Sequence, residues 1–249
     1  AAPEVAGLDS FEDRYEDLQM NLQLAALETL LCAGDAAHGF IERMAEAMKD
    51  KRISVKFGAF KGLAAMKELA APHAQQMATA LLHPSFEVRR MGAETLGEMG
   101  PAAAPYAEKL LTGALTDADW DVRVACCKAL GKQGAAAGAQ ASKIALAMED
   151  EKKAVKIAAT YALGEMGEAA APHLFNLMPL LSTGDPKVRL AAVEASGNLG
   201  KVALSYFGLE QKIEECSQRD IDENVQAAAK EAYAKILATK DTELKWTNY

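Results

Sequence analysis

Apolar residues recur along this chain in blocks with a nearly fixed period. When a valine-like residue is taken as the anchor of each block, the anchors stand 33, 33, 34, 33, 33 and 37 residues apart. The anchors are Leu22, Val55, Val88, Val122, Val155, Val188 and Val225. A second series keeps the same register, at Pro72, Pro105, Ala139 and Pro172. A fixed period of this size predicts an array of stacked repeats.

Within each block the apolar spacing is helical. Apolar residues fall 4, 8 and 11 positions after the anchor, as in Val155, Ala159, Leu163 and Met166, and therefore lie on one stripe of a helix. Glycine follows at the twelfth position in five blocks, where a left-handed helix C-cap favours it. These glycines are Gly34, Gly100, Gly134, Gly167 and Gly200. The proline that follows is expected to begin the next helix.

Each unit is thus predicted to be a helix A, a short turn and a helix B. Aspartates in the turns are expected to cap helix B, at Asp117, Asp119, Asp150 and Asp185. The predicted A/B pairs are 36–49/53–67, 71–82/86–99, 104–115/120–133, 139–149/152–166, 171–182/186–199 and 203–217/222–238. One hairpin cannot bury its apolar stripe alone, so the units are expected to stack. We expect a single domain over 1–249, with a degenerate unit at 10–34, repeats over 35–238 and an aromatic tail at 239–249.

The third and fourth units carry a recognisable pattern. The matching residues of the third unit are Asp117, Asp119, Val122, Arg123, Ala125, Leu130, Gly131 and Gly134. This pattern resembles the HEAT repeat, in the short form found in phycobilin-lyase-like repeat proteins. The next copy matches at Val155, Lys156, Leu163, Gly164, Gly167, Ala170, Ala171 and Pro172, and the resemblance covers about 20–238. It implies an all-α fold, a right-handed α-solenoid of about seven helical hairpins like an armadillo superhelix. It also implies a scaffold that binds partner proteins.

A basic residue follows the anchor in the five central units. The row is Lys56, Arg89, Arg123, Lys156 and Arg189, with Gln23 and Gln226 at its two ends. The HEAT resemblance implies that each basic side chain pairs with an aspartate of the neighbouring turn. The alternative interpretation is a basic ladder that binds phosphate groups.

The resemblance further implies that helices B line the concave surface. Positions 2, 6 and 10 after the anchor lie opposite the buried stripe, and five of the seven residues at position 2 are large and apolar. An apolar strip bordered by charge is typical of protein interfaces. The predicted partner-binding residues are Phe57, Arg90, Val124, Lys128, Ile157, Tyr161, Leu190 and Glu194. The alternative is that the position-2 side chains are buried between adjacent helices B.

Charge and composition narrow the classes of partner. The net charge of -8 and the pI near 5.2 disfavour nucleic acid and anionic membrane surfaces. No apolar run reaches the length of a transmembrane helix. The four cysteines form no CxxC pair and suggest reduced thiols, with no metal site. We expect an intracellular protein that is soluble or peripheral in a complex. The start Ala-Ala-Pro indicates, as an alternative, a chloroplast or mitochondrial protein after removal of a transit peptide.

Motifs for catalysis are not evident in the sequence. None of the four histidines is followed by glutamate, so the paired His-Glu motifs of the HEAT-like deoxyhypusine hydroxylases are missing, and there is no P-loop, G-x-S-x-G or H-E-x-x-H. We therefore expect a non-catalytic scaffold or adaptor subunit without a cofactor. The alternative is a phycobilin-lyase-like subunit or a chaperone for chromophore-bearing proteins. Trp246 and Tyr249 are expected either to dock on the solenoid or a neighbour, or to fray.

Overall fold

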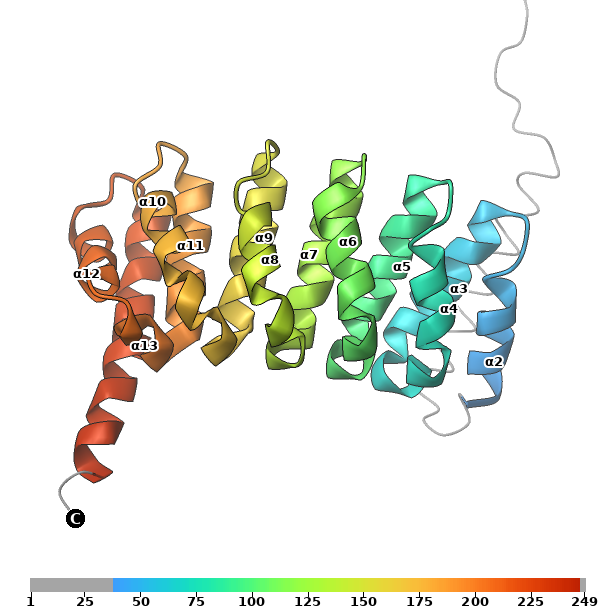
Figure 1. Ribbon diagram of the computed structural model, residues 1–249, viewed down its shortest axis with the longest axis horizontal. Helices are drawn as coiled ribbons and strands as arrows, with labels where there is room; N and C mark the ends of the chain where they lie inside the picture. The colour runs from blue at the N-terminus through green and yellow to red at the C-terminus, as the bar shows by residue number, and fades with distance from the viewer. Residues whose placement is uncertain (1–37, 247–249) are drawn as a thin grey trace, which may run out of the picture.

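The chain forms a row of helical hairpins that stand side by side (Figure 1). The structure, a computed structural model, describes residues 38–246, and within them every regular element is a helix. Six hairpins fall in this range. The expected first unit, 10–34, lies outside the described residues, as does Gly34.

The two helices of each hairpin follow the predicted order. The A helices are α2 (His38–Ala47), α4 (Ala74–Ala80), α6 (Ala107–Thr116), α8 (Ala141–Ala147), α10 (Leu177–Leu180) and α12 (Leu209–Arg219). The B helices are α3 (Ile53–Ala65), α5 (Phe86–Glu98), α7 (Trp120–Gln133), α9 (Lys153–Glu165), α11 (Pro186–Leu199) and α13 (Glu223–Trp246). Most B-helix bounds lie within one residue of the predicted ones.

The A helices begin differently from the prediction, because a 3-10 segment precedes each from α4 to α12. These segments are η2 (Lys67–His73), η3 (Gly100–Tyr106), η4 (Gly134–Gln140), η5 (Gly167–Asn176) and η6 (Gly200–Ser205). Pro72, Pro105 and Pro172 lie inside them instead of starting an α-helix. Proline disfavours the α conformation in the residue before it, so the α-helix starts only after the proline.

The glycines after the B helices adopt positive φ angles, although their conformation is not the predicted left-handed helical one. Gly134 has φ 56° and ψ -134°, and Gly200 has φ 53° and ψ -120°. Residues with a Cβ rarely adopt this region, so glycine is needed for a sharper reversal than a left-handed cap gives. In the first described unit Lys67 occupies the same position, with φ 50°.

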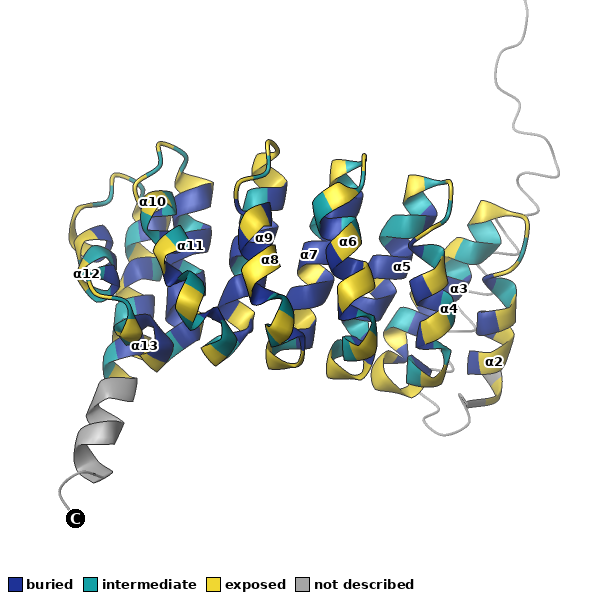
Figure 2. Ribbon diagram, in the orientation of Figure 1, coloured by how far each residue is buried: buried dark blue, intermediate teal, exposed yellow. Residues whose placement is uncertain are grey.

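Small residues let successive B helices pack closely. A Cβ added to Gly97, Gly131 or Gly164 would lie 2.9, 3.1 or 2.8 Å from the Cα atom of an alanine in the next B helix. Successive A helices instead meet mainly through their 3-10 segments. Successive B helices therefore pack directly against one another, and the buried residues lie between the helices (Figure 2).

The last hairpin departs most from its predicted bounds. Gly208, with φ 92°, separates η6 from α12, so helix A begins at Leu209 instead of residue 203. Helix α13 continues to Trp246 and does not end at residue 238. The expected tail thus starts as helix. The side chain of Trp246 and all of Tyr249 lie outside the described part, so their docking remains a prediction.

Candidate protein-interaction surface

The B face is the surface of α3, α5, α7, α9, α11 and α13 that points away from the A helices. Of the described residues two positions after the anchors, Ala227 is exposed and the others are partly buried on this face. Val124 and Leu190 pack partly against the core, Ile157 and Arg90 are intermediate, and Phe57 is 40% exposed. The row therefore lies between the two predicted alternatives, because each side chain has one part in the helix interface and one part on the surface.

A first hollow of about 460 Å³ lies on the B face over α3, α5 and α7. Of the predicted partner-binding residues, Phe57, Arg90 and Lys128 line it, and Lys61, Glu94, Glu98 and Lys132 complete its charged rim. Four cationic and two anionic side chains thus surround a floor that includes Phe60 and Met91.

Two of the four cationic side chains in the first hollow form ion pairs with its glutamates, and two lysines do not. Arg90 pairs with Glu94 at 3.2 Å, and Lys132 pairs with Glu98 of the preceding B helix. Lys61 and Lys128 form no ion pair with any described residue. The hollow therefore carries positive charge that the described residues do not neutralise.

A second hollow, of about 340 Å³, lies over α9, α11 and α13 and has the opposite charge balance. Glu165, Glu194 and Glu231 line it with one cation, Lys235, which pairs with Glu231 at 2.7 Å. The Tyr161 hydroxyl donates a hydrogen bond to Glu194, and burial together with this bond raises the pKa of Tyr161. The predicted residues Tyr161 and Glu194 thus lie in a contact between repeats as well as on the surface.

The predicted partner-binding residues are therefore not one continuous strip. Val124, Ile157 and Leu190 line neither hollow. Sequence reasoning also missed a row of exposed apolar residues at the first position of three successive B helices. These are Ile53, Phe86 and Trp120, which are 47%, 38% and 42% exposed. The same repeat numbering places them two positions before the anchors, and each stands four residues before a position-2 residue, on the same side of its helix.

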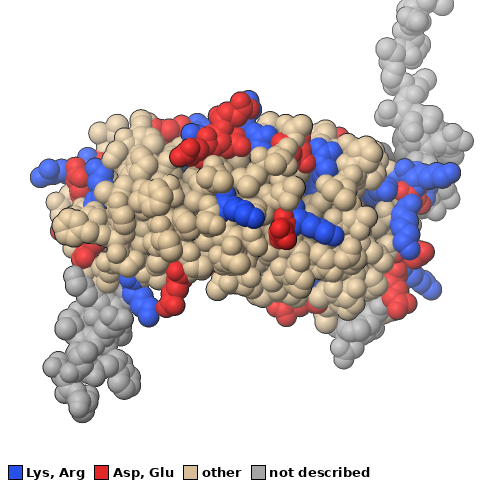
Figure 3. Space-filling view, in the orientation of Figure 1, with Lys and Arg blue, Asp and Glu red and all other residues tan. Residues whose placement is uncertain are grey.

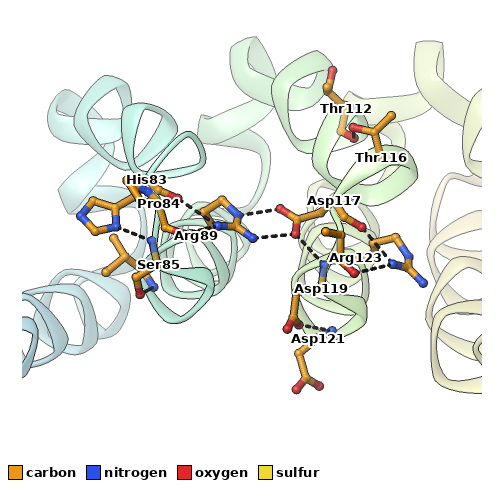
Figure 4. Close-up of polar contacts among 12 residues, drawn as sticks. His83, Pro84, Ser85, Arg89, Thr112, Thr116, Asp117, Asp119, Asp121 and Arg123 are labelled. Atoms are coloured by element: carbon orange, nitrogen blue, oxygen red, sulfur yellow. Dashed lines mark hydrogen bonds and ion pairs between the residues drawn. The ribbon is translucent and has the colours of Figure 1, made fainter.

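At three places on the loop side of the stack an arginine ties one hairpin to the next, and Figure 4 shows the first of them. The Arg89 guanidinium donates two hydrogen bonds to the Asp117 carboxylate, of 2.7 and 2.8 Å, and a third to the carbonyl oxygen of His83 in its own loop. Arg123 binds Asp150 in the same way, at 2.8 and 3.0 Å. Such two-pronged pairs fix geometry as well as charge.

The third rung of this ladder joins Arg189 to Asp220, at 2.7 and 2.8 Å, and both side chains are nearly buried. Hydrogen bonds from Arg189 lower the pKa of Asp220 against the opposing effect of burial. The basic row is thus engaged with carboxylates at its arginines, and those arginines are not free to grip phosphate.

The predicted ladder is wrong at its two lysines. Lys56 and Lys156 form no ion pair within the described part of the chain. In the loops that follow Lys56 and Lys156, the partner position is held by His83 and Thr183. Neither residue has a carboxylate, whereas the same position in the other loops is Asp117, Asp150 or Asp220.

Two of the predicted caps serve the ladder instead. Asp117 and Asp150 accept hydrogen bonds from the backbone of their own turns and from arginines, and do not cap helix B. The side chains that cap B helices include Ser85, Asp119 and Asp185, and Asp222 accepts backbone hydrogen bonds in the same way before α13.

The opposite surface, which we call the A face, is formed by the A helices and their 3-10 segments. Figure 3 shows that uncharged side chains cover most of it. Exposed apolar residues occur here as well, at Leu82, Leu146, Phe175 and Phe207. Leu82 also lines two further hollows, of about 470 and 570 Å³, which adjoin α4 and the loop that follows it.

The described residues show no cluster that suggests metal chemistry. No group of three or more histidine, cysteine, aspartate or glutamate side chains between residues 38 and 246 is placed to hold a metal ion. Cys126 and Cys127 are buried, and burial raises the pKa of Cys127 to about 12. Within the same range, every helix is too short or too polar to pass through a lipid bilayer.

Repeated two-helix units, glycine-linked stacking and an arginine–aspartate ladder define an all-α solenoid. The family model for HEAT repeats matches residues 74–142, 107–179 and 142–234. The chain therefore belongs to the HEAT-repeat family, whose repeats generally mediate protein–protein interaction.

Solved structures support the fold. An engineered protein has a TM-score of 0.60 at 16% identity, over 80% of this chain and 96% of its own. The archaeal HEAT-like repeats protein of Thermococcus onnurineus NA1 has a TM-score of 0.58 at 14% identity, over 88% and 95%. YibA of Escherichia coli has a TM-score of 0.57 at 16% identity, over 89% and 79%. No curated protein matches the chain in sequence.

Proposed function

We infer that this protein is a non-catalytic scaffold or adaptor subunit that binds a partner protein on its B face. The observation that carries this proposal is the first hollow, where exposed Phe57 and a buried apolar floor are surrounded by charged side chains. An apolar centre with a polar rim is the usual anatomy of a protein interface. Membership of the HEAT-repeat family supports it, because such repeats typically bind proteins.

A pull-down with mass spectrometry tests the proposal when wild type is compared with two variants. Phe57→Asp places a carboxylate on the B face, and Leu82→Asp places one on the A face at a residue that is 82% exposed. Because Phe57 is only 40% exposed, circular dichroism and thermal unfolding must show that both variants keep the wild-type fold. Partners that are lost with Phe57→Asp and kept with Leu82→Asp support the B face. Partners lost only with Leu82→Asp overturn it.

Mutation of the half-buried residues gives a second, more demanding test. Ile157→Asp with Leu190→Asp is expected to abolish partner binding if these side chains contact the partner. Leu190 packs partly against the core, so thermal unfolding must be measured in parallel. Loss of binding with helicity retained supports a role in the interface, whereas unfolding assigns the pair to the core.

The lyase-like alternative rests on the repeat resemblance alone, and fold analogy is weak evidence for chemistry. Addition of a bilin to the purified protein tests it. A red-shifted, tightly bound chromophore would favour that alternative over the scaffold.

A further inference from the structure

The two hollows of the B face carry opposite charge balances. Four cations and two anions line the hollow over α3, α5 and α7, whereas one cation and three anions line the hollow over α9, α11 and α13. The protein as a whole is acidic, with a net charge of -8. Positive charge gathered at one end of the binding face of an acidic protein indicates a partner with negative charge there, because complementary potentials steer and orient association.

Two side chains make this positive charge available. Lys61 and Lys128 occupy equivalent positions on α3 and α7, on either side of α5, and neither forms an ion pair with a described residue. A partner carboxylate can therefore bind them without displacing an ion pair of the described residues. The other cations of this hollow, Arg90 and Lys132, already pair with Glu94 and Glu98.

Apolar side chains accompany the lysines on the same three helices. Phe57 lies one turn before Lys61, and Trp120 lies two turns before Lys128. Ile53 and Phe86 extend this exposed row over α3 and α5. The surface thus offers an apolar row and, beside it, two unpaired ammonium groups.

We propose, on the basis of the proposed function, that the hollow over α3, α5 and α7 binds an acidic amphipathic helix of a partner protein. One face of that helix carries apolar residues that meet Phe57 and Trp120, and its edge carries carboxylates that meet Lys61 and Lys128. A helix presents the same face every seven residues, about 10.5 Å apart. That repeat fits the spacing of about 8–10 Å between packed helices, so one apolar residue of the partner can meet each B helix. The second hollow is acidic and repels negative charge, so it orients the partner along the row of B helices with its acidic part over α3, α5 and α7.

Fluorescence of Trp120 provides a direct readout. The chain has two tryptophans, so Trp246→Phe leaves Trp120 as the only one. The probes are three synthetic 21-residue peptides. One has leucine and phenylalanine at alternating spacings of three and four, with glutamate and glutamine elsewhere. A second has lysine in place of glutamate, and a third keeps the glutamates but has serine in place of the apolar residues.

The glutamate peptide is expected to bind at least tenfold more tightly than the lysine peptide and to shift the Trp120 emission. The serine version is expected to bind at least tenfold more weakly than the glutamate peptide. Lys61→Glu with Lys128→Glu should reverse the preference between glutamate and lysine. The matched control, Lys109→Glu with Lys143→Glu, makes the same change in net charge on exposed residues of α6 and α8 and should leave it unchanged.

Equal affinity for the glutamate and lysine peptides, or a preference that survives Lys61→Glu with Lys128→Glu, would overturn the proposal. Displacement of the peptide by a 21-nucleotide oligothymidine, with a steep dependence on salt, would overturn it in favour of nucleic acid. Preference for the lysine peptide with a Trp120 shift would overturn the acidic partner and leave the B face as the binding surface. The pull-down with Phe57→Asp and Leu82→Asp tests that binding surface separately.

Discussion

At the scale of single residues, the backbone after each B helix depends on glycine. Gly100, Gly134, Gly167 and Gly200 all have positive φ angles, and Lys67 is the one non-glycine residue between residues 38 and 246 with this conformation. The sequence predicted that helix B ends at these glycines, because each stands at the twelfth position after an anchor. It did not predict their ψ angles, which depend on how the following 3-10 segment packs.

Replacement of Lys67 by glycine should stabilise the protein. Its side chain is exposed and its φ is 50°, so Lys67→Gly removes backbone strain without loss of core contacts. The expected gain in the free energy of unfolding is about 1 kcal/mol, measured by urea unfolding. Gly134→Ala makes the reverse change at φ 56° and should destabilise the protein. A loss of stability in Lys67→Gly would show that the lysine is not strained.

The Arg189–Asp220 pair makes stability depend on acid pH. The hydrogen bonds from Arg189 lower the pKa of Asp220 below its ordinary value of 3.8. A lowered carboxyl pKa in the folded state stabilises the protein above the unfolded-state value, and this contribution is lost as the pH falls through the folded-state value. We expect Asp220→Asn to be less stable than wild type at pH 6, with a difference that shrinks below about pH 4. Thermal unfolding across this range measures it, and a difference that stays constant with pH would contradict the account.

At the scale of the elements, close contact between helices follows from residues with little or no side chain. The glycines nine positions after the anchors touch alanines in the next B helix, and the 3-10 segments each bury one alanine: Ala70, Ala103, Ala137, Ala170 and Ala203. The sequence predicted the B helices well because their stripes are regular. It predicted the A helices less well, because the proline pattern fixes a turn whose 3-10 form depends on packing between neighbouring hairpins.

A methyl group added between two B helices should destabilise them. In Gly164→Ala the new Cβ would lie 2.8 Å from the Ala195 Cα atom, so α9 and α11 would have to separate. The expected loss is about 1–3 kcal/mol. Gly58→Ala in α3 is the matched control, because nothing lies within 4 Å of its Cβ position, and it should gain about 0.5–1 kcal/mol. Equal effects in the two variants would mean that the close packing carries no stability.

A missing rung of the ladder can be installed between the fourth and fifth described hairpins. Lys156→Arg and Thr183→Asp together place an arginine and an aspartate where the other rungs have them. The free energy of unfolding of the double variant is expected to exceed the value predicted from the summed effects of the two single variants by about 1 kcal/mol. That difference is the coupling energy of a well-formed pair. A double-mutant cycle by chemical unfolding measures it, and zero coupling would show that the loop of the fifth hairpin cannot reach the arginine.

At the scale of the whole molecule, each hairpin contacts mainly its neighbours along the row, so damage should stay local. Hydrogen–deuterium exchange of Gly164→Ala is expected to rise most in α9 and α11 and least in α3. A uniform rise across residues 38–246 would show that the stack unfolds as one unit.

The repeat register predicted the stack, and three of the residues that it proposed for partner binding, Phe57, Arg90 and Lys128, line the first hollow. It missed Ile53, Phe86 and Trp120. These residues are exposed because they stand at the N-terminal end of a helix, which the angular pattern of apolar positions does not show. It also expected ion pairs at Lys56 and Lys156, where the partner position one repeat later has no carboxylate. The first error comes from the use of the angular pattern alone, and the second from the treatment of each unit without the loop of the next one.

The central claim is that the B face contacts the partner, and photo-crosslinking tests it most directly. A benzophenone amino acid is placed at position 57 on the B face and, in a second sample, at position 82 on the A face, which is more exposed. The account predicts a partner adduct at position 57 and none at position 82, with the crosslinked peptide rich in acidic and apolar residues. An adduct at position 82 alone would contradict it.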